Sequence, residues 1–300
     1  MRANLRQVLR VAMIAAPLTL AMAACGRDAA APDSEPLDEA EALLIGREIA
    51  TEVQGMAASF GLNGFLRPPG DLGFGFHPRP GSVCPTFTPF PPSDSDGDGV
   101  PDALTLSFIL PACSFTGRDG ALLEITGTVE ISDPSTTEFG FRVVVTRFQH
   151  KVTRPDASFV LRRLDGVVQV LRSETAFSAR DTTTAVHESS DGHSVSLAKA
   201  WLIGFVADPS QSIDGWRHLP SGTLTVNGST IRTRGQVAHS LDIRTLTGLH
   251  FDATCDAEQK FDAGVLIITK LHPEHSVTIR VEFTGCGEEP VVTLVPPPGA

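Results

Sequence analysis

The residues best suited to chemistry are the acidic groups of the stretch DSDGDGVPD, residues 94–102. Its carboxylates fall at positions 1, 3, 5 and 9 of the stretch and belong to Asp94, Asp96, Asp98 and Asp102. Position 6 is a glycine, where the chain can turn sharply, and position 7 is Val100, whose backbone carbonyl offers a further oxygen. Oxygen atoms are the ligands of calcium, and close aspartates repel one another unless a cation or solvent screens them. The spacing therefore predicts a calcium site formed by these four aspartates and the carbonyl of Val100.

This stretch resembles the EF-hand loop, and the wording DGDGVPD is still more similar to the calcium repeats of thrombospondin type 3. The resemblance covers a single copy and implies a structural ion rather than a reaction. Position 12 is Thr105 instead of the usual bidentate acid, and residues 104–108 alternate like a strand instead of continuing as a helix. The missing acid predicts weak binding, in the roughly 10⁻⁴–10⁻³ M range of extracellular modules. The alternative interpretation is an acidic surface turn that holds no ion.

The N-terminus has the pattern of an export signal. Residues 1–24 carry three arginines and then an uncharged apolar run, which is typical of a secretory signal peptide. The sequence AMAAC, ending at Cys25, resembles a bacterial lipobox, which implies a lipid on Cys25. Gly26 after the cysteine implies export to the outer membrane, with the protein facing the periplasm or the cell surface. The alternative is ordinary cleavage after Ala23 or Ala24, which would leave Cys25 unmodified.

The number of cysteines agrees with lipidation. There are five, and an odd thiol in an exported chain requires an explanation. Lipidation of Cys25 leaves four, and chain order favours the pairs Cys84–Cys113 and Cys255–Cys286, although other pairings are open. Each of these pairs closes a loop of about 30 residues, worth roughly 3–4 kcal/mol in the chain-entropy model. Disulfides predict an oxidising compartment.

Charge limits the partners. Removal of residues 1–24 leaves 21 basic and 35 acidic residues, a formal charge of −14. Nucleic-acid binding requires clustered Lys and Arg, so this acidic chain is not expected to bind nucleic acid. Membrane attachment is expected through the lipid on Cys25, and the remaining candidates for a partner are a protein or a hydrophobic ligand.

The spacing of apolar residues and the composition of each segment predict the elements that position the acidic stretch. Residues 25–36 predict a lipidated tether, and residues 37–62 an amphipathic helix. An apolar stripe on this helix, expected to pack against a sheet, consists of Ile45, Ile49, Val53, Met56 and Phe60. Residues 63–103 predict a Gly/Pro-rich loop that contains the calcium stretch, and residues 288–300 a flexible tail.

Residues 104–287 predict one all-β domain, because apolar and polar residues alternate with period two in many short segments. Asp165-Gly166 and Asn227-Gly228 predict two-residue hairpin turns between strands. The fold class is therefore mainly β with one N-terminal helix. An antiparallel sandwich, a barrel and a large curved sheet each satisfy this pattern.

No catalytic motif is visible, so the chain is not expected to be an enzyme. Two polar segments with histidines, HPEH at 272–275 and HESSDGH at 187–193, predict exposed turns rather than metal sites. The sequence thus favours an exported, lipid-anchored envelope protein whose β domain is braced by calcium and has a non-enzymatic binding or structural role. The alternatives are a carrier of a hydrophobic ligand in the cavity of a curved sheet, by analogy of fold alone, and an envelope hydrolase.

Overall fold

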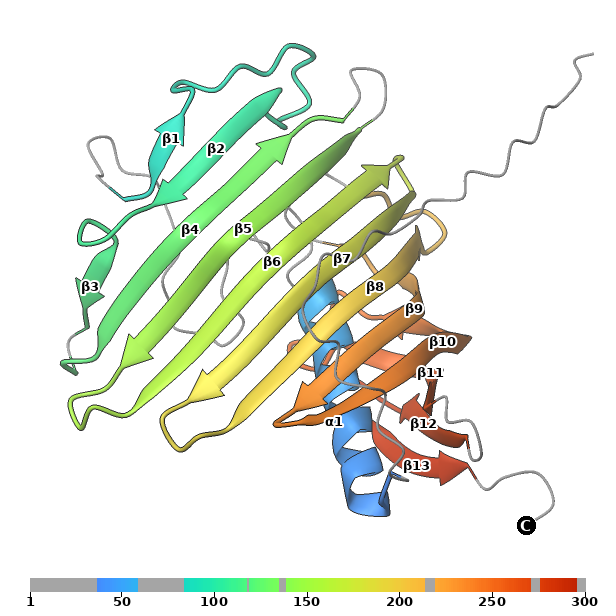
Figure 1. The fold of residues 1–300 in the computed structure, drawn as a ribbon. Helices are drawn as coiled ribbons and strands as arrows, with labels where there is room; N and C mark the ends of the chain where they lie inside the picture. Colours follow the sequence, from blue (N-terminus) through green and yellow to red (C-terminus); the bar gives the residue numbers. More distant parts are fainter. Residues whose placement is uncertain are drawn as a thin grey trace, which may run out of the picture.

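The computed structural model describes residues 37–58, 84–117, 119–134, 139–213, 219–270 and 276–295. These residues form one helix and thirteen strands (Figure 1). In chain order the elements are α1 (Glu39–Ala58), β1 (Thr86–Thr88), β2 (Ala103–Phe108), β3 (Ser114–Thr116), β4 (Leu122–Ser132), β5 (Gly140–Thr153), β6 (Phe159–Arg172), β7 (Ala176–Ser189), β8 (Ser194–Ala207), β9 (Gly222–Arg234), β10 (Val237–Phe251), β11 (Phe261–Lys270), β12 (Val277–Phe283) and β13 (Val291–Val295). Over these ranges, no helix is both long enough and apolar enough to cross a membrane.

The strands form a single antiparallel sheet, which confirms the mainly β prediction. Its order is β1-β2-β4-β5 and then every strand in sequence to β13, while the short β3 pairs with β4 outside this path. The first and last strands of this order do not pair with each other, so the sheet is open. Of the three predicted architectures, the structure therefore has the large curved sheet.

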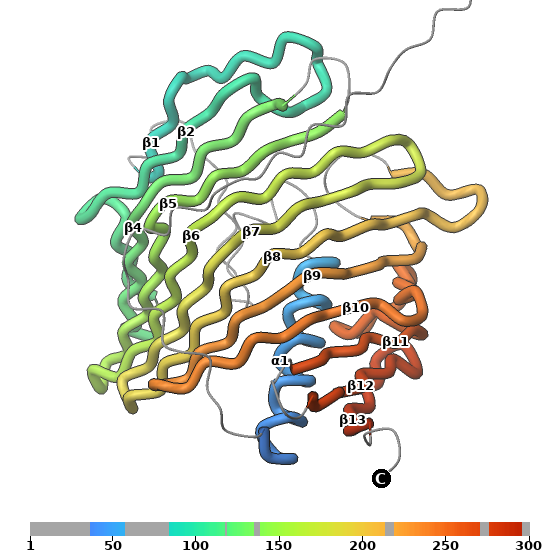
Figure 2. Tube along the Cα trace, turned by 45° about the vertical axis from the view of Figure 1, so that its right-hand side comes forward, coloured from blue at the N-terminus to red at the C-terminus, as the bar shows by residue number. Residues whose placement is uncertain are grey.

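The sheet curls around α1. Side chains of the helix contact β8 and β9 by ion pairs and β12 and β13 by packing. Six flat strands would span about 24 Å between the first and the last, whereas a helix is only about 10 Å wide. Contact with strands this far apart therefore requires the sheet to bend, and both views place α1 between β9–β10 and β12–β13 (Figure 1 and Figure 2).

The predicted apolar stripe of α1 faces the core. Ile45, Ile49 and Val53 are at most 1% exposed and belong to one hydrophobic cluster that extends through the sheet. The helix begins where Asp38 accepts a hydrogen bond from the backbone N–H of Glu41, at 2.7 Å, as an N-cap does. The helix begins at Glu39, two residues after the predicted start at 37, and residues 59–62 of the predicted helix, Phe60 among them, lie outside the described residues.

The prediction of two hairpin turns was wrong. Asp165-Gly166 lies inside β6 and Asn227-Gly228 inside β9, where each glycine has a positive φ. A Cβ on Gly166 would come within 2.2 Å of the carbonyl oxygen of Thr182, and one on Gly228 within 2.1 Å of that of Ala200. These glycines permit close approach of the neighbouring strand instead of reversing the chain.

Four strands were missed by the sequence analysis: β7, β13 and the three-residue strands β1 and β3. The inward side chains of β7 include Asp181, Thr183 and Ala185, so Phe177 is the one large apolar residue that marks its buried face. β13 lies within the predicted tail and pairs with β12 at one edge of the sheet. Hydrophobic alternation therefore fails where the buried face is polar or the strand is short.

Candidate metal centre and buried charges

The acidic stretch forms most of the connection between β1 and β2. The backbone N–H of Asp102 donates to the carbonyl of Ser93 at 2.8 Å, which closes the loop. The N–H of Asp133, just after β4, donates to the carbonyl of Pro101 at 3.1 Å. Val100 is fully buried in the hydrophobic core. The loop is thus fixed to the sheet at its C-terminal end, close to its acidic groups.

Three of the predicted ligands come together in this loop. Asp94, Asp96 and Asp98 each present a carboxylate oxygen, and these atoms lie within 4.8 Å of one another. Backbone N–H groups orient them: Gly97 and Gly99 donate to the two oxygens of Asp94 at 2.8 and 3.0 Å. The N–H groups of residues 98 and 100 donate to Asp96 and Asp98 in the same way. The spacing of the sequence therefore produces a local cluster of carboxylates.

Asp98 is the unusual member of the cluster. Its Oδ2 atom is buried and, within the described part of the chain, has no hydrogen-bond partner. Burial raises the pKa of Asp98, and the charges of Asp96, Asp133 and Asp94 raise it further. A desolvated carboxylate oxygen without a donor is costly, and a cation is the partner that would relieve both the burial and the repulsion.

Asp102 is not part of this group of carboxylates. Its Oδ1 accepts hydrogen bonds from the backbone N–H of Ser95 at 3.0 Å and from the Ser95 hydroxyl at 2.8 Å. These bonds hold the pKa of Asp102 below its usual value. In this conformation Asp102 closes the loop, and the acidic cluster consists of Asp94, Asp96 and Asp98.

Both predicted disulfides are confirmed. Cys84 bonds to Cys113 and Cys255 to Cys286, with sequence separations of 29 and 31 residues. The first pair encloses the acidic loop together with β1 and β2. Disulfides are compatible with an exported, non-cytoplasmic protein. Cys25, the predicted lipidation site, lies outside the described residues.

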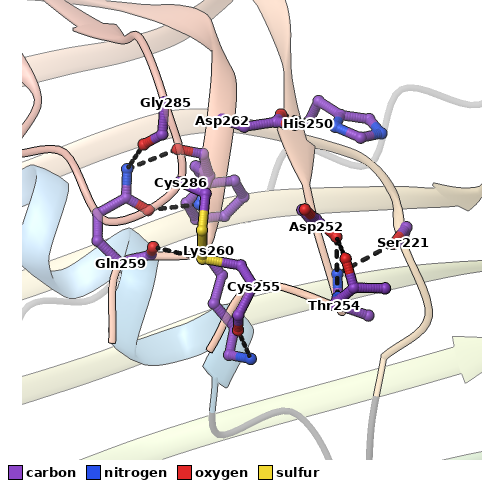
Figure 3. The surroundings of a disulfide bond; sticks show 12 residues. Ser221, His250, Asp252, Thr254, Cys255, Gln259, Lys260, Asp262, Gly285 and Cys286 are labelled. Atoms are coloured by element: carbon purple, nitrogen blue, oxygen red, sulfur yellow. Dashed lines mark hydrogen bonds and ion pairs between the residues drawn. A yellow bond between two sulfur atoms is a disulfide. The ribbon is translucent and has the colours of Figure 1, made fainter. Parts of the chain in front are cut away.

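The second disulfide joins the β10–β11 connection to the β12–β13 connection (Figure 3). Lys260 donates from Nζ to the carbonyl of Cys255 at 2.6 Å, and Gln259 donates from Nε2 to the carbonyl of Phe261 at 2.6 Å. These bonds satisfy polar groups that the turns would otherwise leave without partners. The polar residues around this disulfide therefore stabilise the two connections that it joins.

His250 on β10 lies between two carboxylates. Its Nδ1 is 2.7 Å from Asp262, which lies beside it in Figure 3, and its Nε2 is 3.1 Å from Asp208. The hydrogen bond to Asp208, together with that to Asp262, raises the pKa of His250 despite some desolvation. With both ring nitrogens bonded to carboxylates, neither is available to activate a hydroxyl group. His250 thus cross-links Asp208 and Asp262, and these contacts favour its charged form.

A second group of polar residues was missed by the sequence analysis: the charges between α1 and the sheet. Arg232 on β9 is fully buried and makes a two-bond pair with Glu48 of α1, at 2.6 and 3.2 Å, and a third bond to Glu41 at 3.1 Å. Lys199 on β8 lies 3.2 Å from Glu52 of α1 and 3.3 Å from Asp181 of β7.

Burial opposes the charge of Lys199, but Asp181 and Glu52 outweigh it and raise its pKa. A signal for this network does exist in the sequence. Glu41, Glu48 and Glu52 follow at helical spacings and so form an acidic stripe beside the apolar one.

The histidine segments have different outcomes. His187 and Glu188 lie in β7 rather than in a turn, whereas residues 190–193 form the predicted turn between β7 and β8. Residues 272–275 lie outside the described residues, so their predicted turn stays a prediction. Comparisons with protein-family models, curated proteins and solved structures find no match to this chain. Its function is therefore inferred from its own residues.

Proposed function

We propose that the protein is an exported, lipid-anchored envelope protein with a non-enzymatic role, and that calcium braces its open sheet at Asp94, Asp96 and Asp98. The signal-like N-terminus and the lipobox-like sequence before Cys25 support the anchor. One observation carries the calcium assignment. The Oδ2 atom of Asp98 is buried without a hydrogen-bond partner among the described residues, beside two other carboxylates.

A bound cation would act on the fold through this loop. It would supply the partner that Asp98 lacks and would neutralise three close negative charges. Val100 anchors the loop in the core, and the Cys84–Cys113 disulfide encloses the loop together with β1 and β2. An ion that fixes the loop would therefore also stabilise these two strands. Calcium suits the site better than magnesium, since calcium accepts flexible oxygen ligands and magnesium demands near-ideal octahedral geometry.

The test is a thermal melt of the oxidised mature chain, made without the lipidated cysteine, in calcium, in magnesium and in chelator. A ligand that binds only the folded state stabilises it by RT ln(1 + [L]/Kd). With a Kd of about 1 mM, about 10 mM calcium would stabilise the protein by about 1.4 kcal/mol. We expect a rise in melting temperature with calcium that magnesium does not reproduce.

The variant D98N separates a metal site from an acidic turn. In calcium it should melt below the parent, whereas in chelator it should melt at or above the parent because a buried, unpartnered charge is gone. D156N is the matched control, since Asp156 is exposed and accepts a bond from the Ser158 N–H in another turn. It should keep the full calcium response. An absent calcium shift, or the same shift in D98N, would show that the loop is an ion-free turn.

A further inference from the structure

Three side chains with nitrogen donors form a row across neighbouring strands. His150 of β5 stands directly opposite Arg162 of β6, and Arg162 stands directly opposite His187 of β7. Opposed residues of antiparallel strands project from the same face, with about 5 Å between neighbours. Glu52 of α1 acts electrostatically on Arg162 and on His187, so this is the face against which α1 lies.

Arg162 has no hydrogen bond or ion pair among the described residues, although its Nε atom is buried. Burial lowers its pKa, and the charge of Glu52 only partly offsets this effect. Glu52 itself is hydrogen-bonded to Lys199 at 3.2 Å. The contrast is Arg232, on the same side of the sheet, which makes three bonds to acids of α1. A largely desolvated guanidinium whose buried Nε has no acceptor is costly, so an anionic partner would stabilise it.

The two histidines complete a set of donors. The Nε2 atom of His150 is buried and has no hydrogen-bond partner in the described ranges. Burial, and then the charge of Arg162, lower the pKa of both His150 and His187. A neutral imidazole keeps one N–H and a protonated one keeps two, so each ring offers at least one N–H to an oxyanion.

The surroundings of the row are apolar. The next row toward the middle of the sheet is Phe148, Leu164 and Ala185, and on β4 the residue opposite His150 is the buried Ile125. A small hydrated anion would gain nothing from these neighbours, whereas an apolar chain would.

We propose that Arg162, His150 and His187 bind the carboxylate or phosphate head of an apolar molecule, whose chain lies along Phe148 and Leu164. A guanidinium can bind either head with two parallel N–H donors, and the flanking imidazoles add one each. This proposal goes beyond the calcium-braced role and does not depend on the metal.

Titration calorimetry of the full oxidised protein tests the proposal with four probes: dodecanoate, dodecyl phosphate, inorganic phosphate and dodecanol. We expect one or both charged amphiphiles to bind about tenfold or more tightly than dodecanol, because a bond to a charged group is lost with the alcohol. The preferred head distinguishes a fatty acid from a phosphate ester. Binding of neither amphiphile, equal binding of dodecanol, or equal binding of inorganic phosphate would overturn the proposal.

The variant R162Q should weaken binding of the preferred amphiphile about tenfold or more, while R163Q should not. Arg163 is the matched control because it is the next residue, projects from the opposite face and is exposed in a pair with Glu188 at 3.0 Å. A melt of the ligand-free variants excludes a purely structural role. R162Q should melt at or above the parent, since an unpaired buried charge is removed. A lower melting temperature with unchanged affinity would mean that Arg162 serves only as a partner for α1.

Discussion

Residues of the same type have different environments on the face of the sheet that α1 covers. Arg232 donates three hydrogen bonds to Glu41 and Glu48, while Arg162 donates none to the described residues. His239, 2% exposed, has its Nε2 atom 3.2 Å from the same Glu41 carboxylate, but neither ring nitrogen makes a hydrogen bond among the described residues. Buried ionic groups are favourable only when acceptors and donors match. The position of the helical acids therefore decides which basic residue is satisfied.

At this scale His250 predicts a pH dependence. The bonds to Asp208 and Asp262 raise its pKa above the value of about 6.5 of an unfolded histidine. The native state then binds more protons than the unfolded state between the two pKa values, so stability falls as pH rises. The contribution of His250 is complete below about pH 6.5 and is lost as the pH rises through its folded-state pKa.

The measurement is denaturant unfolding of the parent and of H250Q across this range. The loss of unfolding free energy in H250Q should be larger at about pH 6 than at about pH 9. H193Q is the control, because His193 lies in an exposed turn. A loss in H250Q that stays constant with pH would contradict the assignment of His250 as a charged cross-link.

At the scale of elements, the strands are longer than their hydrophobic pattern indicates because irregularities are built into them. The β5–β6 ladder shifts register between Val145 and Phe148, and there Asp165 accepts a hydrogen bond from the N–H of Arg147 at 2.6 Å. In β9, Asn227 accepts from the N–H of Thr245 at 3.3 Å, where the ladder to β10 shifts. The polar residue before each glycine thus pairs an amide that the bulge would leave free.

The glycines of α1 give a prediction for the packing of the helix on the sheet. A Cβ on Gly46 would come within 2.4 Å of Cγ1 of Val292 on β13, whereas a Cβ on Gly55 would meet nothing within 4 Å. Alanine raises helix propensity at both positions by up to about 1 kcal/mol. At Gly46, overpacking costs typically about 1–3 kcal/mol and outweighs this gain.

G46A should therefore lower the free energy of unfolding by about 1–2 kcal/mol, and G55A should raise it by about 0.5–1 kcal/mol. Chemical denaturation of the two variants measures both. Equal stabilisation by the two substitutions would mean that α1 does not pack this closely against β12 and β13.

At the scale of the whole molecule, an open sheet has two edge strands whose backbone groups lack a neighbouring strand on one side. One end carries the Cys84–Cys113 disulfide and the acidic loop beside β1 and β2. The other end carries the Cys255–Cys286 disulfide beside β11 and β12. The middle is held by local pairing of consecutive strands and, on one face, by α1. Covalent bonds thus occur where the sheet has fewest neighbours.

This arrangement predicts different effects of the two disulfides. C84A/C113A and C255A/C286A should each lose about 2–4 kcal/mol of unfolding free energy, because the closed loops have similar lengths. The calcium response should fall only in C84A/C113A, since this disulfide encloses the acidic loop. Calcium melts of both variants measure the difference. Equal loss of the response would contradict a local coupling between the disulfide and the ion.

Sequence by itself determined the features that depend on neighbouring residues along the chain. Alternation predicted most of the strands, helical spacing predicted the buried stripe of Ile45, Ile49 and Val53, and cysteine order predicted both disulfides. The acidic cluster was also accessible, because Asp94, Asp96 and Asp98 lie within five residues of one another and need only a local turn to meet.

Only the tertiary structure decided the features that depend on register and curvature. A period-two pattern is the same in a sandwich, a barrel and an open sheet, and a glycine after Asp165 reads equally as a turn or as a bulge. The partners of Arg232, and one of the two partners of Lys199, come from a helix about 150 residues or more away in the chain. Among the described residues Arg162 has no such partner, because the curl of the sheet sets where the acids of α1 reach, and no short-range pattern encodes that distance.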